Sequence, residues 1–385
     1  MAQSPPPPPP DSSSHWLWTG EQAYALLAKA LAGACKSVRF EMYIYRADGS
    51  GNRFLAALEQ AAARGVRVQV LVDGFGAAAL PAGYWQNLEK CGGRVRVFNP
   101  LKWSSFVFRN HRKLVVVDDS VAFVGGYNIA DEYSGDGLTR GWRDLGYAVG
   151  ETATVRELAD SFDAMFLNFD FRQRMLRRLR NPLQRPIAAR HRPSSCVLLG
   201  GPRIARNQFR QKLLQVLRNA KSVQITSGYF LPDFRLRRAL RQVVRRGGRV
   251  ELMLAAKTDV PLAQLAARAL YGTLLRGGIE IWEYEPQILH SKLAIVDGLA
   301  FVGSSNLDSR SFGINYELMV CVEHPRAVEE ARKIFAADLT HATGQNWQTW
   351  HATQTWLTRL RGFFARILLT KVDPWLARRL RRSLS

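Results

Sequence analysis

The sequence predicts an α/β protein made of two tandem lobes that repeat the same order of strands and helices. Its 385 residues are enough for two domains of ordinary size, and an apolar content of 47% can supply a large core. A short motif, His-x-Lys followed by four residues and then Asp, begins at His111 and again at His290. These two copies lie 179 residues apart. A repeat of that length indicates the duplication of a whole α/β domain rather than a solenoid.

In the first half, the spacing of apolar residues predicts strands that alternate with helices. The four apolar residues Leu114–Val117, which follow the first motif, are typical of a buried strand. Residues 53–64 have apolar side chains at helical spacing, and Gly65 then supplies a helix end. Helices are also expected at 21–33 and 84–90, and strands at 37–45, 66–72 and 95–98.

The second half repeats this order. Residues 293–296 form the apolar run after the second motif and predict the matching buried strand. Each motif strand leads into a Gly-rich turn that ends in an asparagine, Asn128 in the first half and Asn306 in the second. One motif could arise by chance, but two copies with the same downstream glycines and asparagine indicate a true internal repeat.

Three segments are expected to lie outside the two lobes. Residues 1–15 contain six consecutive prolines and lack the order of a secretory signal, so they predict a disordered tail. Residues 171–195 are rich in Arg and Pro and predict a basic linker, and residues 343–385 predict a separate basic amphipathic segment. The lobes are therefore expected at 16–170 and 196–342. No run approaches eighteen uncharged apolar residues, so no helix is expected to span a bilayer.

Composition limits the partners and the chemistry. The net charge of +22 predicts a polyanionic partner, which could be nucleic acid or an anionic membrane surface. The four cysteines are widely spaced and form no CxxC pair, so they predict buried free thiols in a reducing compartment rather than disulfides. No cluster of residues has the spacing of metal ligands, so no metal is expected.

The residue types of the motif suit reaction at a phosphodiester. Imidazole is neutral and nucleophilic near pH 7, and it can also deliver a proton. His111 and His290 could therefore serve as nucleophile and general acid on opposite sides of one phosphorus. Lys113 and Lys292 follow two residues later, so in an extended strand they point to the same face as the histidines. These lysines and the two turn asparagines could donate hydrogen bonds to the non-bridging oxygens of the transition state.

The two motifs resemble the HKD signature of the phospholipase D superfamily, and the resemblance covers most of residues 16–340. This resemblance implies two phospholipase D-like α/β lobes, each a mixed sheet flanked by helices, related by a pseudo-two-fold axis with the active site between them. Neighbouring segments resemble, more narrowly, bacterial cardiolipin synthases of the B type, which lack N-terminal membrane spans. These segments are residues 40–45, 73–76, 228–232 and 303–308.

The resemblance also implies roles for several other residues. Asp118 and Asp297 complete the two motifs and are counted among the catalytic residues. They are expected to act structurally or electrostatically rather than as acid–base groups. Asp144 and Glu317, which follow the two motifs, are expected to accept a hydrogen bond from a catalytic histidine and so fix its tautomer. Ser304 gives the second turn a hydroxyl donor that the first turn lacks, so the lobes are not chemically equal.

The activity implied is phosphatidyl transfer without a cofactor. One histidine would attack the phosphorus of phosphatidylglycerol and expel glycerol, and the hydroxyl of another phospholipid would then attack the phosphohistidine. We expect a peripheral enzyme on the cytoplasmic face of the bacterial inner membrane, with a monomeric catalytic unit and no nucleic-acid partner. The alternatives are a phospholipase D-type hydrolase and a phospholipase D-family nuclease, and the positive charge is consistent with the nuclease.

Three segments leave alternatives open. From Trp356 onward, aromatic and aliphatic residues recur at steps of three and four with arginines between them, which favours a helix at the bilayer interface over one packed on the lobes. The arginines of the linker could face lipid phosphates or solvent. Residues 102–110, which include aromatic and basic side chains before the first histidine, could form an apolar rim for acyl chains or a core loop.

Overall fold

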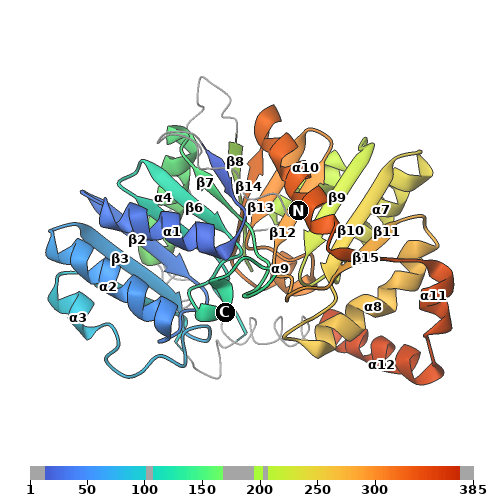
Figure 1. Ribbon diagram of the computed structural model, residues 1–385, viewed down its shortest axis with the longest axis horizontal. Coiled ribbons are helices and arrows are strands. Elements are labelled where there is room, and N and C mark those ends of the chain that lie inside the picture. Colours follow the sequence, from blue (N-terminus) through green and yellow to red (C-terminus); the bar gives the residue numbers. More distant parts are fainter. Residues whose placement is uncertain (1–13, 101–106, 168–194, 203–206, 373–385) are drawn as a thin grey trace.

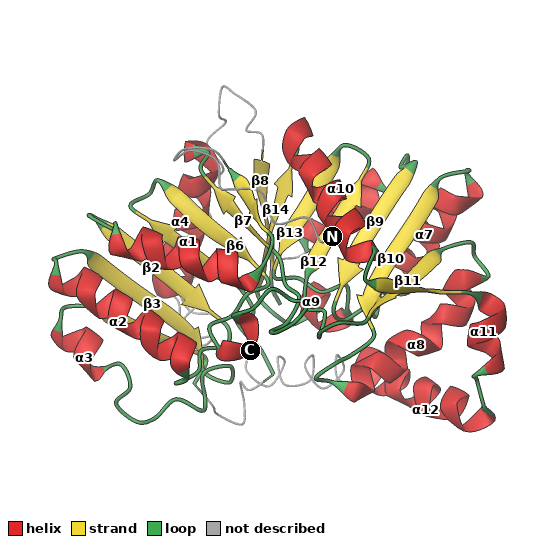
Figure 2. Cartoon of the chain, viewed as in Figure 1, coloured by secondary structure: helices red, strands yellow, loops and turns green. Residues whose placement is uncertain are grey.

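We describe the fold from a computed structural model, which defines residues 14–100, 107–167, 195–202 and 207–372 (Figure 1). The predicted tail, all of the predicted linker except its last residue, and the end of the basic C-terminal segment lie outside these ranges, as do residues 102–106 of the suggested rim. The described chain forms two lobes, each a mixed β-sheet with helices on its faces (Figure 2). This arrangement confirms the predicted two-lobe α/β fold.

The first lobe contains a seven-stranded sheet in the order β1-β7-β6-β5-β2-β3-β4. Strands β2, β3 and β4 run parallel, as expected for strands joined by helical crossovers, and the remaining strands pair antiparallel. The elements are β1 (His15–Leu17), α1 (Gly20–Ala32), β2 (Ser37–Met42), α2 (Gly49–Ala63), β3 (Arg67–Asp73), α3 (Gln86–Lys90), β4 (Arg94–Phe98), β5 (Leu114–Val117), β6 (Val121–Gly125), the 3₁₀ turn η1 (Asp131–Tyr133), β7 (Gly146–Val149) and α4 (Thr152–Leu167).

The second lobe repeats this arrangement in an eight-stranded sheet, in the order β15-β11-β10-β9-β12-β13-β14-β8. Its elements are β8 (Ser195–Gly200), α6 (Gln208–Val216), β9 (Ser222–Ser227), α7 (Phe234–Arg245), β10 (Arg249–Ala255), α8 (Pro261–Leu275), β11 (Glu280–Tyr284), β12 (Lys292–Val296), β13 (Leu299–Gly303), α9 (Ser309–Gly313), β14 (Glu317–Val322), α10 (Pro325–Leu339), β15 (Ala342–Gln345), α11 (Trp347–Ala352), α12 (Trp356–Ile367) and the π-helical turn η2 (Leu368–Val372).

A single apolar core joins the lobes. It combines side chains of β5, β6 and β7 with side chains of β12, β13 and β14, and it includes the inner faces of α4 and α10. Figure 1 shows the two sheets meeting in the middle of the molecule, with α2 and α3 at one end and α7 and α11 at the other. The two motif strands, β5 and β12, therefore lie close to the seam between the lobes.

Several element boundaries differ from the sequence expectations. Helix α2 begins earlier than expected because Asp48 caps it, accepting a hydrogen bond from the amide of Gly51. Strand β2 ends at Met42 rather than at residue 45, and the following residues turn toward the seam. Strand β15 pairs with β11, so the second sheet continues past the boundary expected at residue 342.

The prediction that all four thiols are buried is wrong. Cys321 is buried, Cys91 and Cys196 are partly buried, and Cys35 is exposed at the end of the α1–β2 connection. Cys35 lies in a turn whose backbone is held by Asp118, so its side chain faces outward. All four thiols are free. None of the helices in the described ranges combines the length and apolarity that crossing a bilayer requires.

Candidate active site

Each motif forms a β-hairpin whose first strand starts just after the histidine. Asp118 directly follows β5, and Asp297 directly follows β12. Both adopt a left-handed backbone conformation, with φ of 53° and 48°. Aspartate tolerates this conformation better than most residues. The Asp118 carboxylate accepts hydrogen bonds from the amides of Cys35, Lys36 and Ser37 at 2.7–2.8 Å.

Asp297 binds the start of β9 in the same way, through the amides of Lys221 and Ser222. Neither aspartate lines the pocket described below. Their place among the catalytic residues therefore stays a prediction, and their carboxylates are bound to the starts of neighbouring strands. Their position agrees with the structural role that was expected for them.

The backbone of each histidine is bonded to the other lobe. The amide of His111 donates to the carbonyl of Tyr316 at 3.0 Å, and the amide of His290 donates to the carbonyl of Arg143 at 2.8 Å. Isolated β-bridges pair Asn110 with Tyr316 and Arg143 with Leu289, and each of them joins one lobe to the other. The two motif segments are thus held against each other across the seam by backbone hydrogen bonds.

The carboxylates that hold the histidines are also exchanged between the lobes. Nδ1 of His111 lies 3.1 Å from Oε2 of Glu317, and Nδ1 of His290 lies 2.5 Å from Oδ2 of Asp144. Each histidine therefore pairs with the acidic residue that follows the other motif. With Nδ1 donating to a carboxylate, Nε2 of each imidazole is free to act on a substrate.

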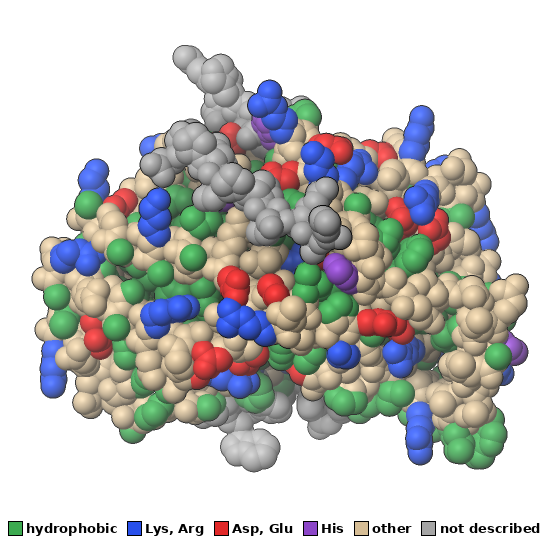
Figure 3. All heavy atoms as spheres, viewed as in Figure 1, with side chains coloured by type: hydrophobic (Ala, Val, Ile, Leu, Met, Phe, Trp, Pro, Cys, Tyr) green, Lys and Arg blue, Asp and Glu red, His purple; other side chains and the backbone are tan. Residues whose placement is uncertain are grey.

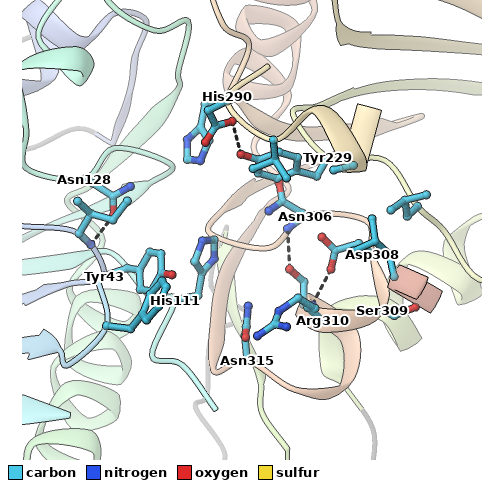
Figure 4. Close-up of a pocket in the computed structure, with 18 of the residues that line it drawn as sticks. Tyr43, His111, Asn128, Tyr229, His290, Asn306, Asp308, Ser309, Arg310 and Asn315 are labelled. Carbon is cyan, nitrogen blue, oxygen red and sulfur yellow. Dashed lines mark hydrogen bonds between the residues drawn. The ribbon is translucent and has the colours of Figure 1, made fainter. Parts of the chain in front are cut away.

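The two histidines open into one pocket of about 400 Å³ at the seam. Figure 4 shows Tyr43 beside His111 and Tyr229 beside His290, with Asn128 and Asn306 on the two lobes. The ring centroids of Tyr43 and His111 are 4.7 Å apart in an edge-to-face arrangement. Much of the remaining wall is apolar or aromatic. It includes Ile44, Phe75, Tyr133, Trp142, Leu231, Val260, Ala263 and Leu369.

Burial keeps both imidazoles neutral. Burial is the main cause that lowers the pKa of His111, and the nearby charge of Glu317 offsets only part of it. Burial and then the charge of Lys292 lower the pKa of His290, against the opposing effect of Asp144. Two neutral imidazoles can each act as a nucleophile, and a bound phosphate would favour the protonated form of one of them.

The paired carboxylates stay ionised despite their burial. Burial alone would raise the pKa of Asp144, but its interaction with His290 and the charge of Lys292 lower it overall. Burial likewise opposes ionisation of Glu317, and the effects of His111 and Lys113 lower its pKa overall. Each carboxylate can therefore stabilise an imidazolium that forms during a reaction.

Both motif lysines are buried beside the histidines. Burial, and next the charge of Lys292, lowers the pKa of Lys113 to about 7. Burial lowers the pKa of Lys292 to about 8, although Asp144 and Glu317 act in the opposite direction. Nζ of each lysine donates to the carbonyl oxygen of its own motif histidine, at 2.7 Å for Lys113. An anionic group entering the site would favour the charged form of both lysines.

The remaining predicted residues divide between the pocket wall and its support. Asn128 lines the pocket, where its oxygen accepts from the amide of Ile44 and its nitrogen donates to Tyr133. Asn306 also lines the pocket. Ser304 does not reach it, because its hydroxyl donates to Glu317. Ser304 therefore belongs with the groups that position His111.

Comparison with known proteins identifies the family. The family model described as "Cardiolipin synthase, PLD-like domain" matches residues 27–166 and 213–339. The chain belongs to this family. Cardiolipin synthase from Geobacillus kaustophilus is 32% identical over 338 residues, which are 85% of this chain and 66% of that protein. Cardiolipin synthase B from Salmonella typhi is 34% identical over 323 residues, which are 82% of this chain and 77% of that protein.

Solved structures show the same fold for this member of the cardiolipin synthase family. The crystal structure of phosphatidylserine synthase from Haemophilus influenzae Rd KW20 superposes with a TM-score of 0.76 at 15% identity, covering 95% of each chain. The polyphosphate kinase from Porphyromonas gingivalis gives a TM-score of 0.57 at 15% identity, covering 90% of this chain and 53% of that one. The chain spans about two thirds of the length of several curated cardiolipin synthases that it matches, such as the Geobacillus protein.

Several pocket residues of this family member were not singled out by sequence reasoning. Tyr43 and Tyr229 stood only within segments that carried the resemblance, and nothing in their spacing marked them as contacts of the histidines. Arg310 lines the pocket, and Arg109, which is buried, lies over the pocket residue Phe75 at 4.8 Å. Residues two apart in an extended segment share a side, so Arg109 and His111 could have been paired from the sequence.

The wall of the pocket is largely apolar, and its charged residues are Arg310 and the carboxylates Asp259 and Asp308. Among the described residues, the terminal nitrogens of Arg109 have no hydrogen-bond partner. No group of three or more His, Cys, Asp or Glu side chains in the described part of the chain is arranged to hold a metal ion. This site can thus place two imidazoles, with a buried lysine beside each, around one anionic group and next to a surface suited to hydrocarbon.

Proposed function

We propose that this protein is a cardiolipin synthase that transfers a phosphatidyl group from one phosphatidylglycerol to the hydroxyl of another phospholipid. The observation that carries the proposal is the pair of neutral histidines in one pocket, each held by a carboxylate of the other lobe and each with a buried lysine beside it. The curated relatives named cardiolipin synthase support the choice of reaction.

In the proposed mechanism, Nε2 of one histidine attacks the phosphorus and the other histidine donates a proton to the departing glycerol. A phosphorus–nitrogen bond forms as the phosphorus–oxygen bond to glycerol breaks. The second histidine, now neutral, accepts the proton of the incoming hydroxyl as that oxygen displaces the first histidine. Lys113, Lys292 and the asparagines donate to the non-bridging oxygens in both steps.

The proposal includes the place of action. The protein would bind one side of a membrane, on the cytoplasmic face of the bacterial inner membrane, without a metal or other cofactor and with a complete site in each monomer. Support for membrane contact comes from α12, which exposes Trp356 (71% exposed), Phe363 and Phe364 between its arginines. Helix α12 also packs on α8 through its small residues, so packing on the lobe and contact with a bilayer are compatible.

A product analysis tests the reaction. Purified protein is incubated in EDTA with phosphatidylglycerol vesicles and, separately, with supercoiled plasmid, and lipids and DNA are examined by mass spectrometry and gel electrophoresis. We expect cardiolipin and free glycerol from the wild-type protein and neither from His111→Ala or His290→Ala. Phosphatidic acid without cardiolipin would indicate the hydrolase, and nicked plasmid without lipid products would indicate the nuclease.

A further inference from the structure

An open apolar groove lies between α8 and α12, outside the histidine pocket. It has a volume of about 630 Å³ and takes its walls from the start of α8, from α12 and from η2. Figure 3 shows hydrophobic side chains gathered at the lower right, over the region where Figure 1 places α12. Most of the large apolar residues of this groove are between 37% and 59% exposed. They include Leu262, Leu265, Leu357, Leu360, Phe364, Leu368 and Val372.

The groove exists because α12 packs on α8 through small residues. A Cβ atom at Gly362 would lie 2.9 Å from Cβ of Ala269, and Ala365 is buried. These two positions bring the helix axes together on one side. The leucines and phenylalanine of the neighbouring positions are then left along the open side, where water contacts them at a cost of about 25 cal/mol per Å² of apolar surface.

The groove continues the wall of the histidine pocket. Val260 and Ala263 line the pocket, while Leu262 and Leu265 of the same stretch line the groove. The same division occurs at η2, where Leu369 lines the pocket and Leu368 lines the groove. Two separate segments thus contribute apolar side chains to both the histidine pocket and the groove.

The elements that build the groove carry arginines and no acidic residue, although Arg268 of α8 is paired with Glu283 of β11. Residues 261–278 and 339–372 contain several arginines and neither aspartate nor glutamate. Arg361 lines the groove, and Arg366 lies 5.9 Å from the centre of the Phe363 ring. A partner for this surface must combine a hydrocarbon part with negative charge. An anionic glycerophospholipid has both, and polybasic segments are attracted to anionic bilayers.

We propose that the α8–α12 groove binds an acyl chain of the glycerophospholipid whose phosphate lies between His111 and His290. The lipid would remain partly in the bilayer, with its headgroup drawn into the pocket along the wall at Leu369. The inference rests on the proposed function for the presence of a lipid phosphate at the histidines. It adds a site for the chain, made jointly by the second lobe and the C-terminal helix.

Photo-crosslinking tests the position of the chain directly. Phosphatidylglycerol that carries a diazirine at the end of one acyl chain is added in vesicles to the full-length protein, illuminated, and mapped by peptide mass spectrometry. We expect adducts on peptides containing Leu262, Leu265 or the residues of α12. Adducts confined to other parts of the chain would overturn the proposal. Because the readout is an adduct, it distinguishes failure of the groove from failure to form cardiolipin.

A substitution in α8 tests whether the groove selects for chain length. For Leu265→Asn, we compare kcat/KM for dioleoyl-phosphatidylglycerol in mixed micelles with kcat/KM for the water-soluble dihexanoyl lipid. The ratio of the two values should fall at least about tenfold, since the burial of several methylenes is lost. Phe234→Asn, which changes an exposed apolar residue on α7, is the matched control and should leave the ratio unchanged.

Two further measurements keep the outcome clear. Leu265→Ala keeps the site apolar and should reduce the ratio less than Leu265→Asn does, whereas equal ratios for all variants would overturn the proposal. Sedimentation of the wild-type protein without lipid tests a competing occupant. A dimer that Leu265→Asn converts to monomers would mean that a second copy of the chain covers the groove, and this also would overturn it.

Discussion

At the scale of single residues, the site depends on carboxylates that fix the tautomers of two buried imidazoles. His290 and Asp144 are 2.5 Å apart, and His111 and Glu317 are 3.1 Å apart, so each histidine has a fixed tautomer before substrate binds. Removing a carboxylate of this kind leaves the imidazole in place but free to adopt the wrong tautomer. The two histidines are alike in this respect, and their separate roles must be found by chemistry.

The first prediction assigns those roles. The family resemblance favours His111 as the nucleophile and His290 as the general acid. With an activated phosphodiester whose leaving group needs little protonation, His290→Ala should still accumulate a phosphorylated enzyme, while His111→Ala should not. Both variants should lose natural lipid turnover by at least about a hundredfold. The measurement is a mass shift on the peptide containing residue 111, stable to base and labile to acid.

If the adduct lies instead on His290 and persists in His111→Ala, the two roles are reversed. An adduct on neither residue, with the protein folded, would contradict the covalent mechanism. Glu283→Gln is a suitable control for folding, because Glu283 pairs with Arg268 away from the pocket.

The second prediction concerns the alkaline limb of the pH profile. The pKa values of Lys113 and Lys292 are lowered to about 7 and about 8, so both lysines are charged below these values and lose charge as the pH rises through them. Since kcat/KM reports the free enzyme, its value for the anionic lipid should fall above about pH 8. Lys113→Arg keeps a charge at this position at every accessible pH, so its decline should be shallower or shifted upward, whatever its absolute rate.

The matched control is Lys90→Arg, on the exposed end of α3, which should keep the profile of the parent protein. If Lys113→Arg also keeps that profile, another group sets the alkaline limb.

At the scale of elements, each motif hairpin is tied to the strand beside it by its aspartate. Asp118 accepts hydrogen bonds from three amides at the start of β2. Burial opposes ionisation of this carboxyl, but the three hydrogen bonds and the charge of Lys36 lower its pKa overall. The sequence pattern predicted β5 because the run is short, apolar and rich in β-branched valine. The partner of the aspartate lies about eighty residues earlier in the chain, so no local pattern could reveal it.

The third prediction is that Asp118→Ala lowers stability but leaves chemistry to the folded molecules. Loss of a charged acceptor for three amides should reduce the free energy of unfolding by about 1–3 kcal/mol, measured by urea denaturation. Asp118→Asn keeps one acceptor oxygen and tolerates the left-handed backbone, so it should cost less. Phosphohistidine formation per folded molecule should change little. Loss of the adduct with unchanged stability would show that Asp118 acts on the site itself.

The fourth prediction concerns α12. Replacing Phe363 and Phe364 with glutamine removes exposed apolar surface and keeps the packing of Gly362 and Ala365 on α8. Sedimentation with phosphatidylglycerol vesicles should weaken severalfold, while Phe234→Gln on α7, equally exposed, should have no effect. Deleting residues 356–385 removes many cations as well, each worth about 1 kcal/mol near an anionic surface, so binding should also become less sensitive to salt. Unchanged sedimentation would mean that α12 has only a packing role.

At the scale of the whole molecule, the exchange of partners between lobes makes one catalytic unit from a duplicated chain. The internal repeat predicted two similar lobes, and the chemistry required both histidines at one phosphorus. The pairing of His111 with Glu317 and of His290 with Asp144 could not be predicted, because it depends on contacts between residues 206 and 146 positions apart. The pocket tyrosines and Arg310 were missed for the same reason, since turns on different lobes bring them together.

An ion pair across the seam shows how firmly the lobes are joined. Arg143 lies in the first lobe beside Asp144, and its carbonyl accepts the amide of His290. Its buried guanidinium pairs with Asp338 of α10 at 2.7 Å and also donates to the backbone of Trp18 and Asp144. Burial opposes the charge of Arg143, but Asp338 more than offsets it, so the pKa of the guanidinium is raised. The backbone that holds His290 is therefore attached to the second lobe through this pair.

The last prediction follows from this attachment. Asp338→Ala leaves the Arg143 guanidinium buried without its counter-charge, which should lower the free energy of unfolding by about 3–5 kcal/mol. Glu280→Ala removes half of an exposed pair with Arg249 and should cost no more than about 1 kcal/mol, so it serves as the matched control. Both are measured by urea denaturation. Because Arg143 also positions His290, Asp338→Ala should reduce lipid turnover in the protein that remains folded. A change below about 1 kcal/mol would mean that the shared apolar core alone holds the lobes together.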